Sequence, residues 1–124
     1  MTKLEVHFKK YKMFKEDAEN EDVSYPMRIE AYFASAFHII EACCALHNIH
    51  INKHSMIRRT LEENPEIFGE ETRRVWELFQ RIENQLRPGL MYGARENGEA
   101  LEEVRGSFEE IEEICLRKLK GLKR

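Results

Sequence analysis

One long stretch rich in apolar and small residues, residues 24–47, limits the fold of this chain more than any other feature. It begins with Ser24, a good helix N-cap, and with Pro26, which suits a first turn because that turn makes no use of its missing N–H. No glycine and no further proline follows within the stretch. The sequence therefore predicts one long helix here.

The predicted helix has two different faces. At about 100° per residue, one half of the helical wheel carries Ile29, Tyr32, Phe33, Ala36, Phe37, Ile39, Ile40, Cys43, Cys44 and Leu46. The other half carries smaller or polar residues: Ala31, Ala34, Ser35, His38, Glu41, Ala42 and Ala45. Such a helix can be covered on both sides, so we expect it at the centre of a bundle. We expect Phe33, Phe37 and Ile40 in the core, and the small face packed closely against a helix of the same chain or of a second subunit.

Four further segments show the spacing of amphipathic helices. They are residues 4–18, residues 53–63, a stretch that opens at Phe68-Gly69 and ends before residues 87–89, and a last segment that starts near Asn97. No alternating pattern predicts a strand. A chain of 124 residues with 42% hydrophobic and 35% charged residues is the size of one folded domain. We predict an all-α, up-and-down bundle of four to five helices that forms a single domain over residues 1–124.

Composition narrows the classes of function. A net charge of −3 argues against a strong nonspecific nucleic-acid binder, although local basic patches can still bind RNA. The sequence holds no run of about 18 apolar residues, and its start lacks the apolar core of a signal peptide, so we expect a cytoplasmic protein. Cys43, Cys44 and Cys115 form no C-x-x-C pair, and we expect reduced core residues.

Few side chains are placed for catalysis or metal binding. His47, His50 and His54 straddle a predicted helix end and lack an i, i+4 partner with a carboxylate, so we predict no metal site there and no cofactor. His38 and Glu41 lie one turn apart on the small face. They could act as an acid–base couple, but a hydrogen bond to another helix or subunit is the favoured interpretation.

A dispersed pattern of residues links this chain to a known family. The pattern consists of Phe37-His38 in the central helix, Lys53-His54 at the start of the next, and Arg87-x4-Tyr92-Gly93 before the last helix. In this order the chain resembles the HEPN domain (higher eukaryotes and prokaryotes nucleotide-binding) over roughly residues 25–119. The resemblance implies an all-α bundle that is often a homodimer and that occurs beside minimal nucleotidyltransferases in paired, toxin–antitoxin-like systems.

Some HEPN proteins are metal-independent RNases with an Arg-x4–6-His motif at the corresponding junction. Arg87 matches the arginine, but Tyr92 stands where the histidine would be. A tyrosine with a pKa of about 10 is a poor proton shuttle at neutral pH, so we predict no catalytic residues. We expect Arg87 and Tyr92 to bind the phosphate of a nucleotide or RNA, with His38, Glu41 and His54 as secondary candidates. The alternatives are an RNase toxin with a degenerate site and a dimerising structural module without a ligand.

Overall fold

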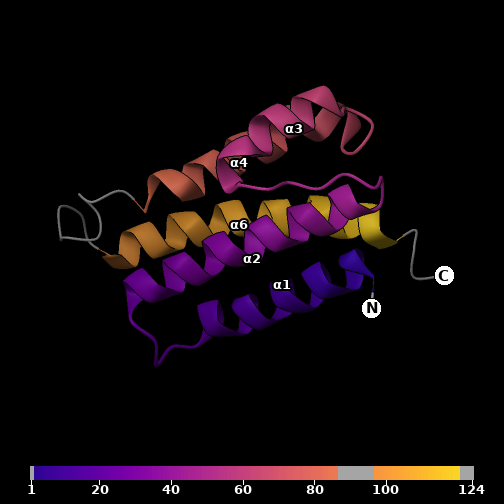
Figure 1. The fold of residues 1–124 in the computed structure, drawn as a ribbon. Helices are drawn as coiled ribbons and strands as arrows, with labels where there is room; N and C mark the ends of the chain where they lie inside the picture. The colour runs from indigo at the N-terminus through magenta and orange to yellow at the C-terminus, as the bar shows by residue number, and fades with distance from the viewer. Residues whose placement is uncertain (1, 87–96, 121–124) are drawn as a thin grey trace.

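The computed structural model describes residues 2–86 and 97–120, and all regular structure within them is helical (Figure 1). The elements are α1 (Lys3–Glu19), α2 (Tyr25–Ala45), α3 (Ile57–Glu63), α4 (Thr72–Asn84) and α6 (Asn97–Lys120). Short 3₁₀ turns, His54–Met56 and Gly69–Glu71, precede α3 and α4. The predicted all-α bundle is confirmed. None of the described helices is long and apolar enough to cross a membrane.

Local sequence signals mark where α1 and α2 begin. Thr2 and Glu5 form a capping box at the start of α1, in which the Glu5 N–H donates to Thr2 Oγ1 over 3.1 Å and the Thr2 N–H donates to Glu5 Oε1 over 3.3 Å. Ser24 is the N-cap of α2, and Pro26 lies in its first turn, as predicted. These signals act within a few residues, which is why the sequence shows them.

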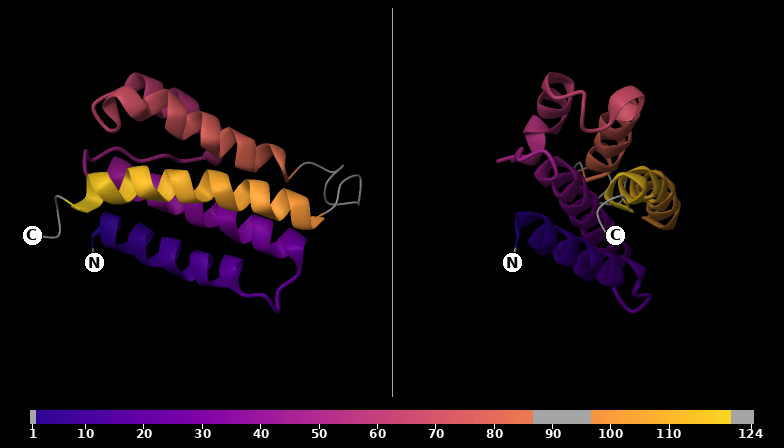
Figure 2. Two further views of the ribbon diagram at one scale, coloured as in Figure 1. Left: turned by 180° about the vertical axis from the view of Figure 1, so that it is seen from behind. Right: turned by 90° about the vertical axis from the view of Figure 1, so that its right-hand side faces the viewer.

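Helix α2 occupies the centre of the bundle, with α1 on one side and α4 and α6 on the other (Figures 1 and 2). Ile29, Ile39 and Ile40 on its large apolar face are fully buried, and so are Ser35 and Ala42 on its small face. The predicted central position is therefore confirmed. The small face packs against α1 of the same chain, where Ser35 Oγ donates a hydrogen bond of 2.8 Å to the main-chain oxygen of Tyr11.

The two central phenylalanines are less buried than the sequence indicated. Ile40 is fully buried, but Phe33 and Phe37 are only partly covered and pack at the margin of the core. Their rings lie 5.0 and 6.4 Å from the ring of Phe79 in α4, measured between centroids. The expectation that both are core residues was wrong, because Phe79 of α4 and, for Phe33, the half-exposed His54 cover this edge of α2 only in part.

The three cysteines are reduced and buried, as predicted. Cys43 of α2 donates from its thiol to the main-chain oxygen of Cys115 in α6 over 3.6 Å. Burial raises the pKa of the Cys44 and Cys115 thiols above the ordinary value. Because a thiol of raised pKa forms little thiolate, these side chains act as packing groups between α2 and α6.

Candidate functional site

The residues proposed from sequence fall into three places. Arg87 and Tyr92 lie outside the described residues. His38 and Glu41 meet at the interface between α1 and α2. His54 is separate from them and half exposed, with Nδ1 2.9 Å from a carboxylate oxygen of Glu83 and its ring at 5.3 Å from Phe33.

A histidine that the sequence reading missed connects His38 and Glu41. His7 of α1 places Nδ1 3.0 Å from Nδ1 of His38 and Nε2 3.2 Å from Oε2 of Glu41. The favoured interpretation, contacts to another helix, is therefore confirmed. His7 shares the inward face of α1 with Leu4 and Tyr11, and this spacing was the one sequence signal that could have found it.

We call this group the histidine cluster; its members are His7, His38, Glu41 and His50. Glu41 lies at its centre. Only 4% of the Glu41 side chain is exposed. Its Oε1 accepts a hydrogen bond of 2.9 Å from the Ile51 N–H and lies 4.0 Å from Nδ1 of His50. Through this bond to Ile51, the carboxylate holds the segment after α2 against the last turns of α2. His50 joins the cluster, whereas His47 and His54 take no part in it.

Burial favours the neutral forms of His7 and His38 near neutral pH. Loss of water contact, together with nearby His7 and Lys10, lowers the pKa of His38 to about 4. Burial also lowers the pKa of His7, although the Glu41 carboxylate opposes that shift. Two neutral rings with Nδ1 atoms 3.0 Å apart form an N–H···N hydrogen bond in which one ring donates and the other accepts.

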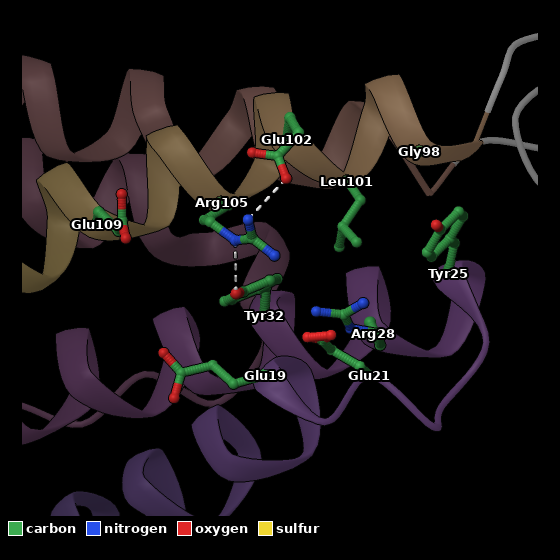
Figure 3. A pocket seen from close by; sticks show the side chains of 10 residues that line it. All are labelled: Glu19, Glu21, Tyr25, Arg28, Tyr32, Gly98, Leu101, Glu102, Arg105 and Glu109. Atoms are coloured by element: carbon green, nitrogen blue, oxygen red, sulfur yellow. Dashed lines mark hydrogen bonds and ion pairs between the residues drawn. The ribbon is translucent and has the colours of Figure 1, made fainter.

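A second site lies at the opposite end of the α1–α2 pair. A cavity of about 510 Å³, here called the Arg28 cavity, opens between the α1–α2 turn, the start of α2 and the first half of α6 (Figure 3). Arg28 is 5% exposed, and its Nε donates to the main-chain oxygen of Ala18 over 2.8 Å. Arg105 donates to the hydroxyl of Tyr32 over 3.2 Å and to Glu102 over 2.6 Å.

Arg28 differs from most other arginines of the bundle in its surroundings. Within the parts of the chain that the structure describes, the one hydrogen bond of its side chain goes to Ala18, and no carboxylate lies within ion-pair distance. A guanidinium group keeps its charge even when buried. Its terminal N–H groups are therefore donors available to an anionic group in the cavity.

The rest of the lining is mixed in charge. Carboxylates of Glu19, Glu21, Glu102 and Glu109 surround the two guanidinium groups in Figure 3. Tyr25 contributes a ring that is 47% exposed, and it lies so close to the start of α6 that a Cβ at Gly98 would approach it to 3.4 Å. The cavity thus offers hydrogen-bond donors, acceptors and an aromatic surface.

Comparison with known proteins yields no matching family model, curated protein or solved structure. The HEPN resemblance, the homodimer and the nucleotidyltransferase partner therefore stay predictions from the sequence. The two clusters of side chains described above are the basis for a function.

Proposed function

We propose that this chain is a HEPN-like module that binds a nucleotide, free or at the end of a single-stranded RNA, in the Arg28 cavity. The observation that carries the proposal is the buried guanidinium of Arg28, which faces the cavity without a carboxylate partner among the described residues. A volume of about 510 Å³ falls within the usual range of small-molecule sites.

Arg28 is suited to hold a phosphate. Its Nε is already bound to Ala18, so the group is oriented before the ligand arrives and loses little freedom on binding. A phosphate oxygen would accept charge-assisted hydrogen bonds from the remaining N–H groups, which are about twice as strong as neutral ones.

The remaining lining favours a nucleotide over a bare polyanion. The exposed ring of Tyr25 is a surface on which a base can stack. Glutamate side chains accept hydrogen bonds from ribose hydroxyls and from exocyclic amines. The four carboxylates outnumber the two guanidinium groups, so the site disfavours ligands with many phosphate charges, and the net charge of −3 has the same effect.

Arg87 and Tyr92 remain part of the proposal on the strength of the sequence resemblance. They precede Gly98, a residue of the cavity, by 11 and 6 positions in the chain. An arginine and a tyrosine supply the same two interactions as Arg28 and Tyr25, a charged grip on phosphate and a stacking ring.

Titration calorimetry with AMP, ATP and a short single-stranded RNA tests the binding proposal. Arg28→Gln should weaken nucleotide binding at least about tenfold, since a hydrogen bond to a charged group contributes about 1.5–3 kcal/mol. Tyr25→Ala, at an exposed position, should also weaken it. Arg117→Gln is the matched control, because Arg117 pairs with Glu71 far along α6 from the cavity. Absence of binding, or equal affinity in all variants, would overturn the proposal.

An RNA cleavage assay in EDTA distinguishes the binding module from the alternative function, a metal-independent RNase. We predict no metal-independent cleavage by the natural chain, because Tyr92 replaces the histidine of the RNase motif. Tyr92→His restores the Arg-x4-His spacing and should bring cleavage that Arg87→Ala removes. Robust cleavage by the natural chain that is lost in Arg87→Ala would establish the RNase instead.

A further inference from the structure

We infer that His7, Glu41 and His50 form a binding site for a divalent transition-metal ion of the zinc class. The three residues come from α1, from α2 and from the segment after α2, and one ligand atom of each lies within 4.8 Å of the other two. Two imidazoles and one carboxylate are a typical ligand set of open zinc sites. This site is separate from the Arg28 cavity and does not depend on the nucleotide proposal.

The distances fit an ion with a small adjustment of one side chain. Ligand atoms at about 2.0–2.2 Å from a tetrahedral ion are roughly 3.3–3.6 Å apart. The separation of His7 Nε2 from Glu41 Oε2 is already 3.2 Å. His50 Nδ1 lies 4.0 Å from the other carboxylate oxygen, Oε1, and one ligand atom of each residue lies within 4.8 Å of the other two. Half of the His50 side chain is exposed, so its ring can turn toward the carboxylate without disturbing the core.

The charge of Glu41 also favours a cation. Its carboxylate is almost fully buried, and among the described residues neither a lysine nor an arginine pairs with it. A buried carboxylate without a cationic partner is unfavourable. The Ile51 N–H satisfies Oε1, while Oε2 and the histidine nitrogens remain as ligands for an ion that supplies the positive charge.

His38 is placed as a positioning residue for the metal ligand His7. When Nε2 of His7 binds the ion, its proton must reside on Nδ1, which then donates to Nδ1 of His38 at 3.0 Å. Without the ion the two rings exchange roles: His38 donates to Nδ1 of His7, and Nε2–H of His7 donates to Glu41. Both states hold the same number of protons. The Phe14 ring stacks on His38 at 5.7 Å and fixes its orientation.

The site has access to solvent. His50 also lines a cavity of about 470 Å³ together with Thr2, Lys3 and Leu4 at the start of α1 and Ala45 and Leu46 at the end of α2. Three protein ligands leave a fourth tetrahedral position, which a water molecule or a small anion in this cavity can occupy.

Calorimetric titration of the full chain with zinc chloride, after removal of metal with EDTA and dialysis, tests the inference. We expect one ion per chain. Loss of a ligand in Glu41→Gln or His50→Ala should weaken zinc binding by more than about tenfold, and His38→Phe, which keeps all three ligands, by about 10–100-fold. His47→Ala is the matched control, because His47 is an exposed histidine three positions before His50 and should leave the affinity unchanged.

Two further measurements, thermal unfolding with zinc and the absorption spectrum with cobalt(II), test the same site. Zinc should raise the melting temperature of the natural chain but not that of His50→Ala, whose exposed side chain can be removed without loss of the fold. Cobalt(II) in place of zinc should give the visible absorption of a nitrogen–oxygen site without a thiolate band. Absence of stoichiometric binding, a thiolate band, or an equal loss in His47→Ala would overturn the inference.

Discussion

The two sides of α2 hold the bundle together in different ways. Toward α4 and α6, α2 presents large apolar side chains such as Ile40, which is fully buried. Toward α1 it presents small residues and three polar groups, Ser35, His38 and Glu41, each of which contacts α1 directly. The apolar side contributes stability through the area it removes from water. The polar side fixes which residues of α1 and α2 face each other.

The difference arises from how closely the helices approach. Small residues let the main chain of α1 come near enough for Ser35 to bond the Tyr11 oxygen at 2.8 Å. A shift of α1 along α2 would break the bond of Ser35 to Tyr11 and the contact of Glu41 Oε2 with His7, at a cost of about 1–3 kcal/mol for each buried group left unsatisfied. Both the register of the helix pair and the histidine cluster therefore depend on this interface.

Removing apolar volume from the α4 and α6 side should have the largest effect. Ile40→Ala deletes a fully buried side chain and should lower the free energy of unfolding by about 2–5 kcal/mol, measured by urea denaturation. The control Glu30→Ala lies on the exposed face of α2 and should change it by less than about 0.5 kcal/mol. A loss below about 1 kcal/mol for Ile40→Ala would mean that this side is not the main apolar core.

Adding side-chain volume on the α1 side of α2 should cause the next largest loss of stability. Ser35→Leu inserts a branched side chain against the main chain of α1 and should cost about 1–3 kcal/mol through overpacking. Ser35→Ala separates the two contributions, because it removes only a hydrogen bond worth about 1 kcal/mol. If urea denaturation shows equal stability for the two variants, the helices are not in the close contact described.

Truncating Phe37, at the margin of the apolar side, should lower the free energy of unfolding by a smaller amount. Phe37 is partly exposed, so Phe37→Ala should cost roughly 1–2 kcal/mol, less than the roughly 3–5 kcal/mol usual for a buried phenylalanine. Thermal or urea unfolding measures the difference from Ile40→Ala. A loss above about 3 kcal/mol would place Phe37 in the core after all.

The last effect is a dependence on pH that belongs to the α1 side. The pKa of His38 is about 4 in the folded chain, below its ordinary 6.5, so the unfolded state binds more protons between these values. The contribution of neutral His38 to the free energy of unfolding should be complete above about pH 6.5 and should decrease as the pH falls toward 4. In EDTA, His38→Phe should flatten this decrease, whereas the exposed control His54→Gln should leave it unchanged. Identical pH profiles for all three proteins would contradict the assignment.

Much of the fold could be read from the chain because its signals are local. The N-cap at Ser24, the proline after it and the stop at Asn64-Pro65 act within one turn of helix, and the apolar period of α6 extends from Leu101 to Leu119. The two-faced pattern of α2 also placed it at the centre correctly, since a helix with no broad charged face has to be covered on both sides.

The candidate sites depended on tertiary structure because their members are distant in sequence. Helical spacing turned His7 inward, but only the packing of α1 on α2 brought it to His38 and Glu41. The fold of the segment after α2 selected His50 and left out His47 and His54. Likewise, no local pattern marked Arg28 as buried, since its burial comes from the α1–α2 turn and the start of α6. Periodicity sets which side of a helix faces inward, whereas the distances between ligand atoms depend on how the helices cross and how their connections return.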